Sequence, residues 1–382
     1  MTVTAAQGFR AAGISAGLKS AGLDLAVLVN DGPLDTAAGV FTANRVTAAP
    51  VRWSRQVLST GRVRAVVLNS GGANACTGPA GFQDTHSTAE RAATALGVGA
   101  VDVAVCSTGL IGVRLDMDAL LPGVDKAVAA LHRGGGAEAA QAILTTDSVA
   151  KESSYVGPGW TVGGMAKGAG MLAPALATML AVVTTDAVVD PATADASLRA
   201  AAAQTFDRVD SDGCMSTNDT VLFLASGASG LRPDPQELTA ALTAVCADLV
   251  AQLLADAEGS TKDIEVAVHG ASTVDDALEV ARSIARSNLL KCALHGEDPN
   301  WGRVLAAIGT TRAAFDPDQL DVAMNGIVIC SHGAAAADRS TVDLSGRRIV
   351  IAVDLNAGTE SATVWTNDLS VDYVRENSAY AS

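Results

Sequence analysis

Short apolar runs that end in polar, glycine-containing loops are the feature that most constrains the fold of this 382-residue chain. Residues 63–68 and 101–106 are two such runs, and their length and composition favour buried strands. Helical patterns follow them at residues 84–96 and 117–132. Strands that alternate with helices are typical of layered structures in which helices cover sheets. We therefore predict a large, mixed α/β domain.

A change of pattern near residue 260 predicts a second, smaller unit. Residues 236–257 form the clearest helix, because apolar side chains recur on one face and Gly259 follows its end. The shorter elements expected beyond it are strands at 264–268, 320–330, 349–355 and 362–366, and a helix at 274–287. We predict an α+β fold with a main domain over 1–260, a smaller α+β domain over 261–355 and a tail over 356–382.

Composition and charge exclude several classes of function. The chain is 49% hydrophobic with a formal net charge of −15, so it can bury a large core and repels phosphate backbones. Its six cysteines form no C-x-x-C pair and its five histidines show no metal-ligand spacing. The apolar run at 171–183 contains Pro174 and is shorter than a membrane span of about 20 residues. We expect a soluble, cytoplasmic protein without metal, nucleic-acid or membrane partners.

The most unusual segment is residues 163–180, whose first half is crowded with glycines. Lys167 is its only charge, and Thr178 is the one threonine of its apolar second half. A hydroxyl is a weak nucleophile that needs a neighbouring base. Cleavage between Ala177 and Thr178 would give Thr178 a free α-amine with a pKa of about 7.7–8.0, so nucleophile and base would share one residue. A core threonine in a buried strand, with Lys167 on a loop, is the alternative that composition alone favours.

Three other polar positions are candidates for chemistry. Backbone N–H groups in the turn at 107–109, with the Thr108 hydroxyl, could stabilise an oxyanion, although an ordinary strand-to-helix turn has the same pattern. The loop at 69–78 could cradle an anion through its backbone amides, but its glycine spacing matches neither a P-loop nor a dinucleotide fingerprint. Glu258, at the end of the long helix, could bind an ammonium group or simply be solvated.

Together these segments resemble the ornithine acetyltransferase (ArgJ) family, the bifunctional glutamate N-acetyltransferases of arginine biosynthesis. The resemblance covers nearly the whole chain. The motifs that carry it, in order, lie at residues 69–78, 107–109, 145–147, 167–171, 177–180, 256–259, 298–303 and 376–380.

The resemblance implies a self-cleaving enzyme with a layered fold like that of N-terminal-nucleophile enzymes. The precursor would divide before Thr178 into an α chain, 1–177, and a β chain, 178–382, and two copies of each would associate. Thr178 would take acetyl from N2-acetyl-L-ornithine, release L-ornithine and pass the acetyl group to L-glutamate in a ping-pong reaction. Acetyl-CoA is an alternative donor in many members, and no other cofactor is implied.

The resemblance also assigns roles to individual residues. Thr178 would be the nucleophile, and Thr108 and Gly109 would form the oxyanion hole. The implied substrate-binding residues are Thr145, Lys167, Thr178, Glu258, Asn377 and Ser382. Glu258 suits the ammonium group of ornithine and Lys167 suits a carboxylate. A role for Ser382 requires the C-terminal tail to return to the active site.

Two further hypotheses remain open from the sequence. An aminopeptidase or amidase with the same nucleophile would pass its acyl group to water instead of glutamate. A binding protein without catalytic activity would keep the fold and leave the chain whole.

Overall fold

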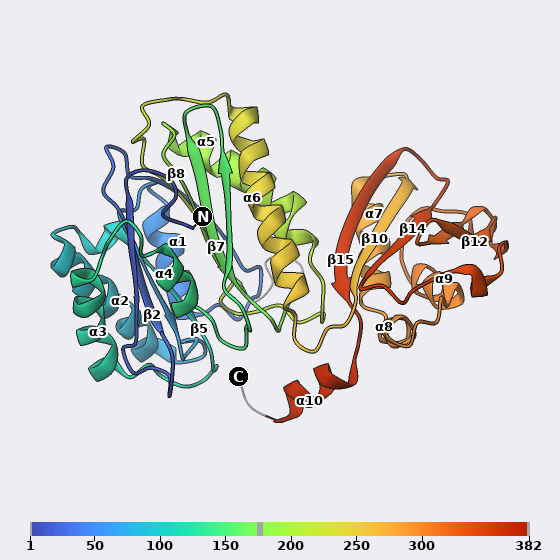
Figure 1. Ribbon diagram of the computed structural model, residues 1–382, viewed down its shortest axis with the longest axis horizontal. Coiled ribbons are helices and arrows are strands. Elements are labelled where there is room, and N and C mark those ends of the chain that lie inside the picture. The colour runs from blue at the N-terminus through green and yellow to red at the C-terminus, as the bar shows by residue number, and fades with distance from the viewer. Residues whose placement is uncertain (1, 174–178, 380–382) are drawn as a thin grey trace.

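The computed structural model describes residues 2–173 and 179–379 (Figure 1). The chain forms two parts: the first holds two sheets with their helices, and the second is built around a third sheet. The predicted mixed α/β architecture is confirmed.

The first sheet has four strands in the order β1-β2-β4-β5. Their bounds are β1 (Phe9–Ile14), β2 (Leu25–Asn30), β4 (Ala65–Ser70) and β5 (Val103–Thr108). The associated helices are α1 (Ala49–Leu58), α2 (Gly78–Leu96), α3 (Met117–Ala129) and α4 (Gly136–Ala142). Every residue of β2, β4 and β5 is buried, which explains why their sequences are continuous apolar runs without alternation.

The second sheet has five strands in the order β3-β9-β8-β7-β6. Their bounds are β3 (Thr36–Phe41), β6 (Lys151–Val156), β7 (Thr161–Lys167), β8 (Leu180–Thr185) and β9 (Thr220–Ala225). The helices α5 (Pro191–Gln204) and α6 (Pro235–Ala255) pack against it.

The two sheets pack face to face between layers of helices. Leu180 and Val182 of β8 belong to the core that contains the first sheet, whereas Ala181 and Val183 belong to the core under α5 and α6. This alternation is what a strand with one face toward each layer must show. The helices α2 and α3 contact the first sheet, so the main part of the molecule has four layers (Figure 1).

The glycine-rich residues before Lys167 form a strand, so the alternative that placed Lys167 on a loop is wrong. Gly164 lies within β7, and a β-carbon there would stand 2.9 Å from Val245 Cγ1 of α6. A side chain at this position would press against α6, which explains a glycine inside the strand.

The third sheet has six strands in the order β13-β12-β11-β14-β10-β15. Their bounds are β10 (Asp263–Ala271), β11 (Asp321–Met324), β12 (Ile327–Ser331), β13 (Ala334–Ala335), β14 (Arg348–Asp354) and β15 (Glu360–Asn367). Its helices are α7 (Val274–Ala285), α8 (Asn288–His295) and α9 (Trp301–Ile308), and α10 (Val371–Ala379) follows the sheet. Short 3₁₀ helices occur at Ala100–Asp102, Phe206–Arg208, Pro317–Gln319 and Arg339–Thr341.

Two expectations for this region need correction. The run at 320–330 is a hairpin of β11 and β12, because Asn325 and Gly326 both have positive φ and turn the chain. The strand β15 pairs with β10, so residues 360–367 belong to the sheet and not to a tail that begins at 356. The segment beyond the sheet begins after Asn367 and carries α10 back below the main part (Figure 1).

The helix α6 is long and apolar enough to cross a membrane by length and composition alone. Half of its most apolar stretch is buried in the protein, where α6 packs on α5, β6 and β7. These contacts are those of a core helix.

Candidate active site

The predicted cleavage site adjoins the beginning of β8, where three strands meet. Ala177 and Thr178 lie outside the described residues, but Met179 follows them directly. The Met179 N–H donates to Asp219 Oδ1 at 3.0 Å, and the next residue, Leu180, pairs with Lys167 of β7 and with Thr220 of β9. The chain therefore enters the second sheet between the end of β7 and the start of β9.

Thr108 and Gly109 form a tight turn at the end of β5. The Thr108 carbonyl accepts hydrogen bonds from the N–H groups of Gly71 and Gly72, both at 3.0 Å. Gly109 has a φ of +128°, and a β-carbon there would lie 2.6 Å from Gly72 N, so only glycine fits. In the described part of the chain no hydrogen bond engages the Gly109 N–H or the Thr108 hydroxyl. Both groups remain available for an oxyanion.

These contacts also bear on the hypothesis that the loop at 69–78 binds an anion through its backbone N–H groups. Its Gly71 and Gly72 N–H groups are already bound to the Thr108 carbonyl. They shape the turn, and the hypothesis that they cradle an anion is not supported.

Two consecutive residues connect the Thr108 turn with the start of β8. Asn218 Nδ2 donates to Ser107 O at 2.8 Å and to Ala73 O at 2.6 Å, and Asp219 binds the Met179 N–H. The candidate oxyanion hole and the residue after the cleavage site are thus held by neighbours in the chain. Sequence analysis missed Asn218 and Asp219 because they fall in no recognisable motif.

Lys167 is buried at the end of β7, and its Nζ donates to Thr145 Oγ1 at 3.0 Å. Burial lowers the pKa of Lys167, although the nearby Asp147 opposes that effect. Asp147 accepts hydrogen bonds from the N–H groups of Thr145 and Gly168, and Lys151 Nζ lies 2.5 Å from its Oδ1. Burial disfavours the charged carboxylate, but Lys167 and Lys151 outweigh burial and lower the pKa of Asp147. The carboxylate of Asp147 therefore holds the backbone at Thr145 and the backbone directly after Lys167, the two residues that form the Lys167–Thr145 hydrogen bond.

Lys151 extends this arrangement to the end of α6. Its buried Nζ also lies 2.5 Å from Asp256 Oδ2, and Asp256 accepts the Ser148 N–H at 3.0 Å. Lys151 carried no signal in the sequence, because its two partners lie 4 and 105 residues away. The buried cluster of Lys151, Asp147 and Asp256 precedes Glu258, which binds the Thr146 hydroxyl and lies near enough to Lys167 to oppose the lowering of its pKa by burial.

Glu258 is mostly buried and bridges distant segments. Its Oε1 accepts the Thr146 hydroxyl at 2.7 Å, and its Oε2 accepts Asn377 Nδ2 at 2.9 Å. A β-carbon at Gly170 would stand 2.6 Å from Glu258 Oε2. Asn377 belongs to α10, so the C-terminal helix contacts this carboxylate. Ser382 lies outside the described residues.

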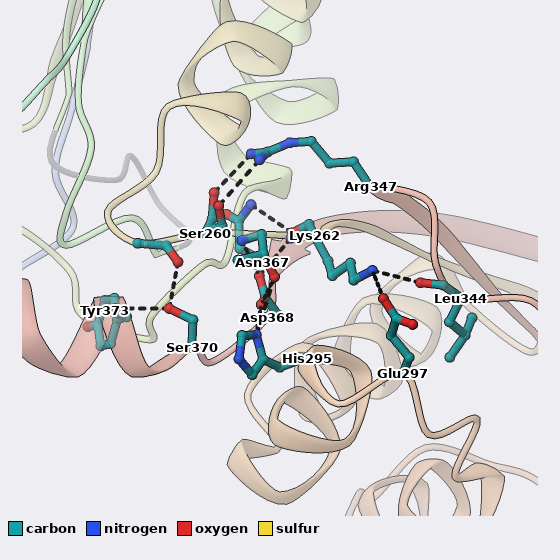
Figure 2. A network of polar contacts seen from close by, with 12 residues as sticks. Ser260, Lys262, His295, Glu297, Leu344, Arg347, Asn367, Asp368, Ser370 and Tyr373 are labelled. Atoms are coloured by element: carbon teal, nitrogen blue, oxygen red, sulfur yellow. Dashed lines mark hydrogen bonds and ion pairs between the residues drawn. The ribbon is translucent and has the colours of Figure 1, made fainter.

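A network of polar contacts ties the segment that leads into α10 to Gly259 and Lys262 (Figure 2). Asp368 accepts from the backbone N–H of Lys262 at 2.8 Å, and its Oδ2 lies 2.7 Å from His295 Nδ1. Ser370 Oγ donates to Gly259 O at 2.5 Å and accepts the Tyr373 N–H at 2.9 Å. The junction between the third sheet and the main part is therefore tied to the residues that immediately follow Glu258.

A cavity of about 230 Å³ lies at the same junction. Glu258, Asp212, Lys291, Asp368 and Tyr373 are among the residues that line it. Within residues 2–173 and 179–379 no group of three or more histidine, cysteine or acidic side chains is arranged to hold a metal ion. The side chains that line the cavity thus include charges of both signs.

Comparison with known proteins identifies a family and close relatives. A family model described as "ArgJ family" matches residues 10–382. The arginine biosynthesis bifunctional protein ArgJ of Streptomyces avermitilis is 67% identical over the full length of both chains. The protein of the same name from Mycobacterium tuberculosis is 60% identical over all of this chain and 96% of the relative.

Solved structures of two such proteins also match parts of the chain. The ornithine acetyltransferase of Mycobacterium tuberculosis complexed with ornithine is 61% identical, with a TM-score of 0.45, and covers 47% of this chain and 96% of its own. The arginine biosynthesis bifunctional protein ArgJ of Bacillus halodurans is 34% identical, with a TM-score of 0.48, and covers 52% of this chain and 97% of its own.

Proposed function

The chain belongs to the ArgJ family, and from that premise we propose that it transfers acetyl from N2-acetyl-L-ornithine to L-glutamate. The products are L-ornithine and N-acetylglutamate, intermediates of arginine biosynthesis. Relatives named as bifunctional arginine-biosynthesis proteins, and an ornithine acetyltransferase complexed with ornithine, support this assignment. We extend the proposal to acetyl-CoA as a second acetyl donor.

The nucleophile in this proposal is Thr178, freed by cleavage of the bond after Ala177. Its hydroxyl attacks the acetyl carbonyl while its own α-amine takes the proton. The observation that carries the proposal is the position of Met179. Asn218 and Asp219 tie the first described residue after the cleavage site to the Thr108 turn.

The Thr108–Gly109 turn provides donors for the developing negative charge. A free N–H and a free hydroxyl in a rigid turn cost no reorganisation when the tetrahedral intermediate forms. Gly109 is needed for that turn because a larger residue would collide with Gly72.

The substrate-binding residues carry charges that suit both substrates in turn. Glu258 binds the side-chain ammonium of the ornithine donor, with Thr146 and Asn377 orienting its carboxylate. Lys167, with Thr145, binds a substrate carboxylate, which N-acetylornithine and glutamate share. One site that binds both amino acids in succession is compatible with ping-pong transfer. Ser382 completes the proposed set.

The remaining features of the proposal concern assembly and surroundings. Two α chains (1–177) and two β chains (178–382) associate in a soluble, cytoplasmic enzyme. The hydroxyl and amine of Thr178 supply the chemistry, so the proposed reaction needs no metal or cofactor.

The proposal is tested with wild type, Thr178→Ala and the control Thr184→Ala. Thr184 lies in β8, and its hydroxyl donates to Val3 O. We expect wild type and the control to give fragments that end at Ala177 and begin at Thr178, by mass spectrometry. Both should form N-acetylglutamate from N-acetylornithine and glutamate, whereas Thr178→Ala should stay whole and inactive.

Two other results would replace the proposal. Free acetate as the main product would indicate the hydrolase, with water as acceptor. A wild-type chain that stays whole after long incubation would indicate a binding protein. Cleavage of Thr178→Ala at the same bond would show that the threonine hydroxyl does not initiate it.

A further inference from the structure

The carboxyl group of Asp219 has no part in the acetyl transfer proposed above. Its side chain is completely buried, and Oδ1 accepts the Met179 N–H at 3.0 Å. Its Oδ2 is also buried and has no hydrogen bond of good geometry to any described residue, although the Ser216 hydroxyl and N–H lie near the carboxyl group and favour its charged form. An unpaired polar atom in the interior costs free energy, so this oxygen requires an explanation.

The position of Asp219 is defined by its bond to Met179. The nitrogen of residue 179 is bonded to the carbonyl carbon of residue 178. Three bonds separate it from the nitrogen of residue 178, and these bonds together span no more than about 4 Å. A carboxyl group that binds Met179 N therefore lies beside the backbone of the residue at which the chain would be cut.

The backbone of Asp219 is held as firmly as its side chain. The Asp219 carbonyl accepts the Thr42 N–H at 2.9 Å, and the preceding Asn218 is anchored to Ser107 and Ala73. The carboxyl group is thus carried by fixed backbone at the start of β9, next to the candidate oxyanion hole.

Self-cleavage creates a chemical need that the finished enzyme does not have. In the uncut chain the nitrogen of Thr178 is an amide and cannot act as a base. Another group must take the hydroxyl proton when Oγ1 attacks the Ala177 carbonyl. The α-amine that serves acetyl transfer exists only after that step.

We propose that Asp219 carries this proton during self-cleavage, an inference that rests on the proposed cleavage before Thr178. Its carboxylate accepts the Oγ1 proton as Oγ1 bonds to the Ala177 carbonyl carbon. The C–N bond between Ala177 and Thr178 then breaks, and the carboxyl group returns the proton to the departing nitrogen. Water hydrolyses the resulting ester, which releases the Ala177 carboxylate and restores the Thr178 hydroxyl.

Two other titratable groups face Asp219, and each is less suited to the task. Lys167, from β7, has its Nζ bound to Thr145 Oγ1, and it must lose its own proton before it can accept one. Cys214 lies in the loop before β9, where burial, then Asp212 and then Asp219 raise the pKa of its thiol. The Met179 contact singles out Asp219 as the group beside the scissile residue.

The electrostatic environment of Asp219 agrees with this role. Burial raises the pKa of Asp219 well above its ordinary value, although the Met179 N–H, Lys167 and Ser216 oppose that shift. A carboxyl group whose pKa is moved toward neutrality both accepts and returns a proton readily. The cleavage rate should therefore rise with pH as the Asp219 carboxyl loses its proton, and then level off.

The test follows cleavage of freshly synthesised full-length chain, by gel and mass spectrometry, in wild type, Asp219→Asn and Asp210→Asn. Asparagine preserves an oxygen acceptor for the Met179 N–H and removes the proton carrier. We expect Asp219→Asn to slow cleavage by about 10²–10⁴-fold. Asp210→Asn is the matched control, since Asp210 is also buried, with an oxygen that lacks a partner among the described residues, and binds Arg286 instead. It should cleave at the wild-type rate.

Two results would overturn the proposal. One is a folded Asp219→Asn chain, judged by circular dichroism, that divides as fast as the control. The other is a wild-type cleavage rate that does not change between about pH 5 and pH 8, where the chain is expected to stay folded. The second measurement decides the matter even if Asp219→Asn fails to fold. A wild-type chain that is never cut would instead reject the proposed function itself.

Discussion

Replacing Lys151 with methionine tests whether the buried ionic cluster supports the site. The Lys151 side chain is fully buried, and its Nζ lies 2.5 Å from both Asp147 Oδ1 and Asp256 Oδ2. Methionine keeps a long apolar side chain and removes the charge. The substitution leaves two carboxylates near each other in the interior without the cation between them.

The expected loss of stability follows from what each carboxylate retains. Removing one partner of a buried ion pair costs about 3–5 kcal/mol. Asp147 keeps the Gly168 N–H and the nearby charge of Lys167, and Asp256 keeps the Ser148 N–H. We therefore expect the lower end, about 3 kcal/mol, in a chain whose total stability is about 5–15 kcal/mol.

The loss should depend on pH in a defined direction. Lys167 and Lys151 together hold the pKa of Asp147 below its ordinary value against the effect of burial. A carboxylate of this kind adds stability above its unfolded-state pKa of about 3.9, and that contribution disappears as pH falls through its folded-state pKa. The difference between wild type and Lys151→Met should therefore stay large from neutral pH down to about pH 4 and should shrink as pH falls further.

Calorimetry at neutral pH and below about pH 4 measures both effects. A loss of 3 kcal/mol corresponds to a fall of roughly 6–12 °C in the melting temperature of a domain of this size. Lys126→Met, on the exposed side of α3, is the control and should change stability by less than about 0.5 kcal/mol. The reasoning would be refuted if Lys151→Met had the same melting temperature as the control at neutral pH, or if it lost more stability in acid than at neutral pH.

Two further predictions concern the proposed chemistry. Thr108→Val removes a hydroxyl with little change of shape, and we expect kcat to fall by about 10²–10³-fold with an unchanged melting temperature; an unaltered kcat would remove Thr108 from the oxyanion hole. Glu258→Gln removes a charge but preserves an acceptor, and because hydrogen bonds to charged groups contribute about 1.5–3 kcal/mol, KM for N-acetylornithine should rise by roughly 10- to 100-fold. Initial rates at varied donor and acceptor should show a smaller change in KM for glutamate, and equal changes would argue against a site for the ornithine side chain.

The local sequence pattern was sufficient to predict strands that are buried on both faces and helices that bury one apolar face. The runs that became β4 and β5 were visible because strands buried on both faces are apolar throughout. The helix α6 was visible because its buried leucines recur with the period of a helix. The segments around Thr108, Thr145, Lys167, Glu258 and Asn377 were found by their resemblance to a family, not by periodicity.

Other features had no local signal and were decided by the tertiary structure. The glycines of β7 argue against a strand in isolation, and only the close approach of Val245 on α6 explains them. The strand β15 was placed in a tail because nothing near it in sequence reveals its partner, β10. Lys151 and Asp219 are unremarkable where they stand in the chain, and their importance arises from Asp256 and Met179, which are 105 and 40 residues away. Periodicity records which face of an element is buried, whereas the pairing of charges across the interior depends on how the elements pack.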